Sequence, residues 1–378
     1  MKAAIFYSEG LKEYDFGEGH PFRGSRFENF INFFKEKFPL EEFEFITPEA
    51  ANDDDLKLIH SREYIDFVEK FYQAISSGES LPPTQEIYQF LSIDNIPGVN
   101  PGKLNLGARL IAGAAKKAGE YVWPRRNPFG ILRGKQGTFE KVITFGGLHH
   151  ATKNYGEGFC IYNDVAICAE NLKRKFNTER ILILDTDAHA GNGTCEIFYQ
   201  DPKVLFIDLH QDPKTLYPGT GFVYEIGEGE GKGFTVNIPL PQFAGNESYK
   251  LVFEEIVFPV VEEFKPQIII RNGGSDPHFA DELTQLGLTL EGLRMIGQKV
   301  RELSKVCNGK AVDLIGSGYN QKVLPWGWLA LISGLANINI KLKEPIPIPK
   351  KFKKDLVLKE TKKVIVELKQ NLRDFWKF

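Results

Sequence analysis

Short, almost uninterrupted apolar runs recur along the middle of the chain, and they constrain the fold more than any other feature. There are six such runs: Val142–Phe145, Ile181–Leu184, Val204–Asp208, Phe234–Ile238, Ile268–Arg271 and Val312–Ile315. Strands that face water on one side alternate apolar and polar residues, whereas strands buried on both faces of a parallel sheet are apolar throughout. The runs therefore predict a buried parallel sheet.

Helical patterns separate these runs. The clearest one has apolar residues three and four positions apart, at Val165, Cys168, Ala169, Leu172 and Phe176. Asn163 or Asp164 would cap its start. Repeated strand and helix units predict an α/β fold, in which a central, mostly parallel sheet is flanked by helices on both faces.

Apolar patterning continues on both sides of the two stretches rich in Pro and Gly, 80–103 and 211–232, so we expect these stretches to be loops and not linkers. We therefore expect residues 1–378 to form a single domain. A Lys-rich tail with apolar residues at helical spacing predicts a C-terminal helix at about 353–376.

Composition and charge exclude several classes of protein. The 378 residues include 47 basic and 50 acidic side chains, a net charge of −3, so direct nucleic-acid binding is not expected. No run reaches the about 18 apolar residues that a membrane span needs. The start of the sequence does not have the apolar region of a signal peptide. Four cysteines without a C-x-x-C pair suit a reducing compartment, and we expect a cytoplasmic protein.

Polar side chains follow four of the apolar runs, where the functional residues of parallel sheets collect. The segments that carry them are Gly146–His150, Asp185–Gly193, Asn272–Asp276 and Gly316–Tyr319. Such a concentration at matching strand ends predicts that the functional site lies at the carboxyl edge of the sheet.

Asp187 and His189 are two residues apart, so on an extended segment they point to the same side. Asp276, at another strand end, can supply a third ligand. Three protein ligands with an open position describe a catalytic zinc site, although Mn²⁺ or Fe²⁺ would also accept this set. The alternative is a polar loop that caps the next helix, and Asp276 at a matching strand end makes it the weaker reading.

His149 and His150 follow a Gly-Gly turn, and tandem histidines are rarely needed for packing. Imidazole titrates near neutral pH and can both accept and donate a proton. Tyr319 follows Gly316-Ser317-Gly318, which could expose its hydroxyl as an oxyanion stabiliser. The alternative for Tyr319 alone is a packing residue at the edge of a turn.

With these motifs the sequence resembles the zinc-dependent histone deacetylase family, which has the arginase/deacetylase fold and includes relatives such as acetoin utilization proteins and acetylpolyamine amidohydrolases. The resemblance runs in order along the chain from Gly17–Arg23 at the start. The motifs that carry it are Gly146–Ala151, Gly158–Asp164, Asp185–Thr194, Tyr217–Gly221, Gly274–Asp276 and Gly316–Tyr319. Only the tail after about Leu342 is poorly covered.

The resemblance implies roles for individual residues. Asp187, His189 and Asp276 would hold zinc, His149 and His150 would be the acid/base pair, and Tyr319 would polarise the acyl carbonyl. It places the positions that contact the substrate at Gly158, Phe159, Tyr217, Leu283 and Asp94. It also implies a K⁺ or Na⁺ ion bound through backbone oxygens around Asp185, Asp187 and His189.

In the family, Asp185 would orient His149 and residue 192 would orient His150. Residue 192 is Asn here, and because a neutral amide favours imidazolium less than a carboxylate does, His150 should be the general base. Two positions depart from the family pattern. Ala190 stands where a second His is usual, and Ser317 interrupts a glycine run.

The resemblance implies a hydrolase in which metal-activated water attacks an acetyl or acyl amide of a lysine-like amine. An acetylpolyamine or other small-amide deacetylase is the alternative within the fold. A non-catalytic protein that binds acyl ligands is the alternative from another class, and the complete ligand set argues against it. Acetylated protein lysine and small acylated amines both suit the same centre, and the sequence leaves the substrate and the oligomeric state open.

Overall fold

The computed structural model describes residues 3–123 and 139–378, which form two compact units. The first unit comprises the described residues of Met1–Lys35, Pro39–Asn177 and Asn192–Ile197. The second comprises Glu36–Phe38, Thr178–Gly191 and Phe198–Phe378. The prediction of a single domain stays a prediction.

In the first unit, three parallel strands lie in the order β2 (Phe43–Ile46), β1 (Ala3–Phe6) and β3 (Lys141–Phe145). Its helices are α1 (Ser25–Lys37, which ends in the second unit), α2 (Asp53–Leu56), α3 (Arg62–Ser77), α4 (Thr84–Phe90), α5 (Leu104–Val122), α6 (Asp164–Phe176) and most of α7 (Asn192–Phe198). The longest of them, α5, packs on both α6 and β3.

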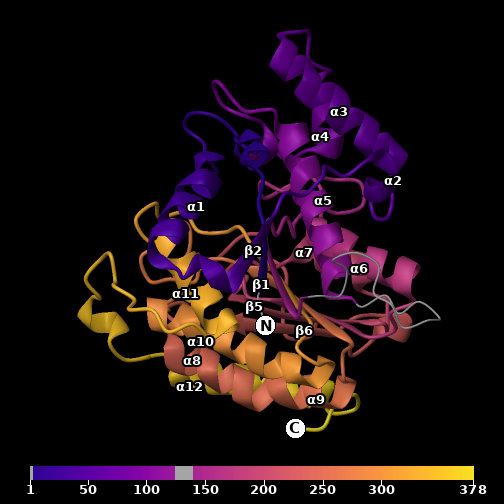
Figure 1. The fold of residues 1–378 in the computed structure, drawn as a ribbon. Coiled ribbons are helices and arrows are strands. Elements are labelled where there is room, and N and C mark those ends of the chain that lie inside the picture. Colours follow the sequence, from indigo (N-terminus) through magenta and orange to yellow (C-terminus); the bar gives the residue numbers. More distant parts are fainter. Residues whose placement is uncertain (1–2, 124–138) are drawn as a thin grey trace, which may run out of the picture. The chain divides into compact units, whose positions relative to one another are not determined.

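In the second unit, five parallel strands lie in the order β8 (Ala311–Ile315), β7 (Ile268–Gly273), β4 (Ile181–Asp185), β5 (Val204–Gln211) and β6 (Thr235–Leu240). Its helices are α8 (Asn246–Val252), α9 (Phe258–Phe264), α10 (Leu290–Leu303), α11 (Leu324–Ala336) and α12 (Leu358–Leu372). A π-helical turn, Phe253–Val257, joins α8 to α9. The orange α8 lies beside the yellow α12 (Figure 1).

The six apolar runs are all strands, and most of them are buried along their whole length. The α/β class with parallel strands and flanking helices is therefore confirmed. Two strands of the first unit were not predicted. Both β1 and β2 have only four residues, and in β2, which pairs with β1, only Phe43 is buried.

Three boundaries differ from the predictions. The stretch 80–103, expected as a loop, contains α4 and a 3-10 turn, Ile93–Asn95. Strand β5 continues through His210 to Gln211, although Gln211 was expected to begin the loop 211–232. The C-terminal helix, expected at about 353–376, extends from Leu358 to Leu372, and a separate 3-10 turn precedes it at Lys350–Phe352. Among the described residues, no helix is long and apolar enough to cross a membrane.

Candidate active site

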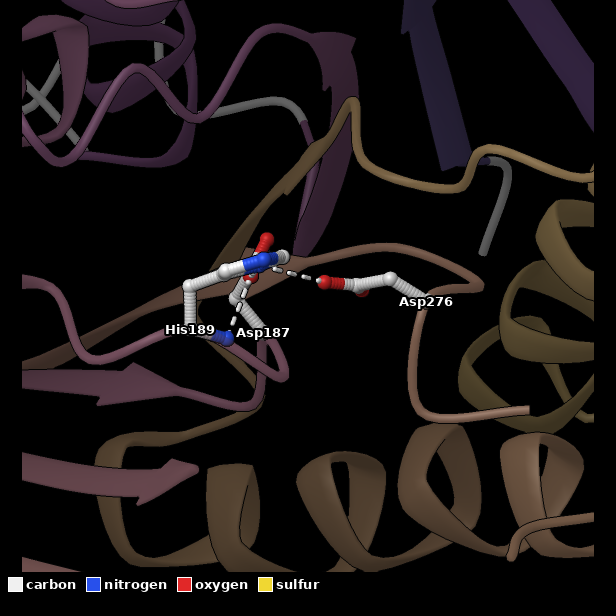
Figure 2. A group of neighbouring side chains, drawn as sticks. All are labelled: Asp187, His189 and Asp276. Carbon is white, nitrogen blue, oxygen red and sulfur yellow. Dashed lines mark hydrogen bonds and ion pairs between the residues drawn. The ribbon is translucent and has the colours of Figure 1, made fainter. Parts of the chain in front are cut away.

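In the second unit, Asp187, His189 and Asp276 come together just beyond the carboxyl ends of β4 and β7 (Figure 2). The pairing of Asp185 with Asn272 sets these two strand ends level, so the segments that follow them meet. Gly273 permits the approach, since its φ is 133° and an added Cβ would lie 2.8 Å from the Asp187 nitrogen. We call these three residues the carboxylate–imidazole cluster.

The ligand atoms of the cluster converge on one point. One nitrogen and two oxygens, one atom from each residue, all lie within 4.8 Å of one another. His189 Nδ1 is 3.1 Å from Asp187 Oδ1 and 3.3 Å from Asp276 Oδ2. Two carboxylates and one imidazole are a ligand set that a catalytic zinc ion accepts, so these residues fit a metal of this class.

Electrostatics show how strongly the cluster favours a cation. Burial raises the pKa of Asp276 well above its usual value, and the nearby Asp187 carboxylate raises it further. Burial lowers the pKa of His189, but its two carboxylate partners more than offset this effect and raise the pKa to about 10. Two buried carboxylates thus need a positive charge between them, which either a proton on His189 or a metal ion supplies.

The Asp276 carboxylate is held at both oxygens. The Ser317 hydroxyl donates to Oδ1 at 2.5 Å and the Ala188 N–H donates to Oδ2 at 3.0 Å. Ser317, which interrupts the family's glycine run, is absent from the residues with positive φ, so no glycine is needed there. The departure therefore adds a hydrogen bond to the cluster. The other departure, Ala190, is buried.

Tyr319 lies near the cluster in the same unit. Its ring is perpendicular to the His189 ring, with the centroids 6.3 Å apart. The Asp281 carboxylate accepts the Tyr319 N–H at 2.8 Å and the Leu283 N–H at 2.9 Å. Burial raises the pKa of Asp281 to about 6 despite these two donors. Sequence reasoning missed Asp281, because an acidic residue five positions after Asp276 has no distinctive spacing.

Asp208 and His210 on β5 form a second pair that the sequence analysis did not single out. His210 Nδ1 lies 3.0 Å from Asp208 Oδ1, and its Nε2 lies 2.9 Å from the Gly221 carbonyl oxygen. Burial disfavours a charged His210, but Asp208 outweighs burial and raises the pKa. The pair ties β5 to the segment that carries Tyr217, which is exposed, as is Leu283.

In the first unit, His149 and His150 follow the buried strand β3, and their ring centroids are 4.2 Å apart. The Asp164 carboxylate accepts N–H bonds from Gly147 at 2.9 Å and from Leu148 at 2.6 Å, which shapes the turn before the histidines. Burial raises the pKa of Asp164 to about 6.

Asn163 is the N-cap of α6, where its side chain accepts the Ala166 N–H. Its amide nitrogen donates to the Ala151 carbonyl at 2.9 Å and to Thr194 Oγ1 at 3.0 Å. The cap therefore also connects the histidine segment to α7. The predicted choice between Asn163 and Asp164 is settled in favour of Asn163.

His150 has the partner that the sequence analysis expected. Its Nδ1 lies 2.6 Å from Asn192 Oδ1, and Asn192 is the first residue of α7. Asn192 Nδ2 in turn donates to Glu157 Oε1 at 2.7 Å. Asp185 accepts the Asp187 N–H at 3.0 Å and the Asn272 amide at 2.9 Å, and its expected role toward His149 stays a prediction.

Gly158 and Phe159 form the centre of a tight turn, in which Glu157 accepts the Cys160 N–H at 2.9 Å. Both central residues have positive φ, 58° and 65°. An added Cβ at Gly158 would lie 2.3 Å from His150 Cδ2, so the ring of His150 packs directly on this glycine. Only glycine fits this position.

The Phe159 ring is fixed from several sides. Its ring centroid is 4.6 Å from that of His20 and 6.3 Å from that of Phe16, and the Tyr14 hydroxyl donates to the Phe159 carbonyl. The Asp94 carboxylate accepts the Gly158 N–H at 3.1 Å, so Asp94 lies beside the same turn. The N-terminal motif around His20 therefore helps to build an aromatic wall.

Comparison with known proteins agrees with this geometry. The model of the family described as "Histone deacetylase domain" matches residues 20–335. The chain belongs to the histone deacetylase family. It is therefore a deacetylase, a hydrolase that acts on amide C–N bonds of acylated amines.

Curated relatives match most of this deacetylase. A protein named "Probable deacetylase" from Archaeoglobus fulgidus is 36% identical over 377 residues, which cover 98% of this chain and 95% of that protein. The acetoin utilization protein AcuC of Staphylococcus aureus is 35% identical over 86% of this chain and 80% of its own length. AcuC of Staphylococcus xylosus is 34% identical with similar coverage.

A solved structure shows the same fold. The crystal structure of the HDA15 HD domain superposes with a TM-score of 0.78 at 23% sequence identity, and the match covers 99% of this chain and 96% of that one. At this identity the likeness concerns the fold of the deacetylase alone.

Proposed function

We propose that this deacetylase is zinc-dependent and removes acetyl or other acyl groups from lysine-like amines. The observation that carries the proposal is the convergence of His189 Nδ1 with one oxygen each of Asp187 and Asp276. These three residues would hold the metal, with Mn²⁺ or Fe²⁺ as the alternatives that the same ligands accept. When bound, the metal would act as a Lewis acid that polarises the acyl carbonyl and activates a water molecule.

The protein's own residues would handle the protons. His150 donates its Nδ1–H to Asn192 Oδ1, because the amide oxygen only accepts, and this leaves Nε2 able to take a proton from water. His149 would be the partner that returns a proton to the leaving amine. Tyr319, anchored through its N–H to Asp281, would donate its hydroxyl to the developing oxyanion.

The substrate would be an acylated primary amine with an alkyl chain. The rings of Phe159, His20 and Phe16 form a rigid aromatic wall, which suits the methylene chain of an acyl-lysine. Asp94, placed at the same turn, would accept hydrogen bonds from the substrate backbone. We also propose a cytoplasmic location, since none of the four cysteines, all of which the structure describes, is in a disulfide.

The test is a turnover assay of metal-free protein reloaded with Zn²⁺, Mn²⁺ or Fe²⁺ separately. Acetate release is measured on an acetyl-lysine peptide, an acetylpolyamine and a small acetamide. We expect zinc to restore activity on the peptide at the highest kcat/KM. Preference for the acetylpolyamine would assign the small-amide alternative. Tight metal binding without any acetate release would instead indicate a non-catalytic acyl-binding protein.

A further inference from the structure

A hydrogen-bonded chain leads from His150 through Asn192 to a carboxylate that no sequence motif singled out. Asn192 Oδ1 lies 2.6 Å from His150 Nδ1, and Asn192 Nδ2 donates to Glu157 Oε1 at 2.7 Å. We infer that Glu157 is a positioning residue of this deacetylase. It fixes the orientation of the Asn192 amide and thereby the tautomer in which His150 can accept a proton at Nε2.

The direction of this chain follows from the chemistry of its ends. A carboxylate only accepts hydrogen bonds, so the amide nitrogen of Asn192 must face Glu157. The amide oxygen then faces His150, and because it also only accepts, Nδ1 must carry the hydrogen. Neutral imidazole holds one hydrogen, which leaves the Nε2 lone pair available. Glu157 therefore sets the direction of every hydrogen bond in the chain.

An amide needs such a partner, whereas a carboxylate at position 192 would not. Rotating an Asn side chain by half a turn exchanges its oxygen and its nitrogen, and the rotated amide would donate to His150 Nδ1. His150 would then carry its hydrogen on Nε2 and could not act as a base there. The two oxygens of an aspartate are equivalent, so its rotation changes nothing. The Asn at position 192 thus makes a third residue necessary.

The local backbone holds Glu157 where this role requires it. Its carbonyl accepts the Cys160 N–H at 2.9 Å, which closes the turn through Gly158 and Phe159. An added Cβ on Gly158 would lie only 2.3 Å from the His150 ring. One tight turn therefore fixes both the packing surface of the imidazole and the carboxylate that orients its partner.

Glu196 offers a matched control. It lies one helical turn after Asn192 on α7, and its pKa is raised by burial and by the charge of Glu157. Glu196 is thus an acidic neighbour of Glu157, while the Asn192 amide donates its hydrogen bond to Glu157. Glu196→Gln removes a nearby negative charge and leaves the chain intact.

The inference rests on the proposed role of His150 as base, and its first test is kinetic. Glu157→Gln can either accept from or donate to Asn192, so both directions of the chain become populated. Only the molecules in which Nε2 carries no hydrogen react, and we expect kcat to fall about 2- to 10-fold with KM nearly unchanged. Glu196→Gln should keep wild-type kcat. An equal fall in Glu196→Gln, or an unchanged kcat in Glu157→Gln, would overturn the inference.

The same Glu157→Gln substitution, made in the variant Asn192→Asp, makes the test specific. In Asn192→Asp, no amide remains to be oriented, and Glu157 faces a like charge instead of a donor. Adding Glu157→Gln to that background should therefore raise kcat or leave it unchanged, opposite to its effect in the wild type. A residue that only stabilises the fold would lower kcat in both backgrounds, and that result would contradict a positioning role.

The third measurement separates this inference from the proposed function. NMR of ¹⁵N-histidine in the metal-loaded protein at pH 8 distinguishes Nδ1–H from Nε2–H, and His150→Ala assigns the signal. We expect Nδ1–H in the wild type and a mixture in Glu157→Gln. If this change occurs but no acylated amine is hydrolysed, the proposed function fails and the positioning role stands. If turnover is observed while the tautomer does not change, the positioning role is wrong.

Discussion

The carboxylate–imidazole cluster and the histidine pair use the same side chain in opposite ways. His189 touches two buried carboxylates directly, which raises its pKa to about 10. His150 contacts the neutral amide of Asn192, which in turn donates to the Glu157 carboxylate. The first arrangement favours a positive charge between the carboxylates, which a proton on His189 or a metal ion in its place can supply. The second places a neutral hydrogen-bond acceptor at Nδ1, which suits the proposed role of His150 as a general base.

A third histidine extends the comparison. His60 is buried in the first unit, where its Nε2 accepts the Asn163 N–H at 3.0 Å. Burial lowers its pKa to about 4. His189 and His60 thus have opposite environments, of which the first favours the charged imidazolium and the second favours neutral imidazole. The two carboxylates in contact with His189, against burial as the main effect at His60, explain the opposite directions of these two pKa shifts.

Removing a ligand from the carboxylate–imidazole cluster should have the largest effect. We expect His189→Ala and Asp276→Ala to abolish both bound metal and activity, because two ligands do not make a stable catalytic site. Metal content measured by elemental analysis after dialysis, next to kcat, checks this. His150→Ala is the matched variant from the histidine pair. It should keep its metal and lose about 10²- to 10⁴-fold in kcat, since only general-base catalysis is removed. Full metal retention in His189→Ala would show that the cluster is not the metal site.

Tyr319→Phe should come next. It keeps the ring beside His189 and removes one hydroxyl donor, and losing such a donor costs about 10²- to 10³-fold in kcat. Elemental analysis should show that metal content is unchanged. A wild-type rate would mean that Tyr319 only packs against the cluster.

Asn192→Asp tests the difference between the two groups directly, since it gives His150 a carboxylate neighbour as His189 has. A carboxylate stabilises imidazolium, so the base would need a higher pH to become neutral. We expect the acidic limb of the kcat/KM profile to move to higher pH, with lower activity near neutrality. An unmoved limb, or one that moves to lower pH, would indicate that another group sets it.

His60→Gln should have the smallest effect on activity and a measurable one on stability. The pKa of His60 in the folded state, about 4, is below its unfolded value of 6.5, so the folded state resists protonation. Its contribution is complete above pH 6.5 and is lost as the pH falls towards 4. The stability difference between wild type and His60→Gln should therefore shrink by about 3 kcal/mol from pH 7 to pH 4.

Reversible denaturant unfolding of the two proteins at matched pH measures this difference. The comparison is needed because Asp164 acts in the opposite sense. Its folded pKa is raised to about 6, so its contribution to stability grows as the pH falls through 6. In the wild type, the pH dependence that comes from His60 and the one that comes from Asp164 oppose each other. Because His60→Gln also contains Asp164, the difference in free energy of unfolding between the two proteins reports the contribution of His60 alone. A constant difference across this pH range would show that His60 is not buried in its neutral form.

Much of the fold could be predicted because it depends on local pattern. Runs such as Ile181–Leu184 are apolar at every position, and no other common element has this signature at that length. The strands β1 and β2 could not be found in this way. Each has four residues, and their strand character comes from pairing with distant segments.

The candidate site likewise contains residues that local sequence pattern reveals and residues that only contacts between distant segments reveal. Asp187 and His189 are close in sequence and follow a recognisable strand, so their convergence could be predicted. Glu157 and Asp281 act through hydrogen bonds to residues 35 and 38 positions away, at Asn192 and Tyr319. An isolated acidic residue is far more often solvated than functional, so only tertiary structure could single these two out.

The left-handed turn at Gly158 and Phe159 limits how the proposed acyl-binding wall can change during evolution. Phe159 has a φ of 65°, a conformation that costs most residues about 1–2 kcal/mol and that only Gly, Asn and Asp adopt readily. A mutation to Val or Ile, the usual small steps that reshape a pocket, would add strain from a β-branched side chain. Selection for longer acyl chains should therefore leave position 159 unchanged and act on neighbours such as Phe16, which has no positive φ and whose ring lies next to that of Phe159.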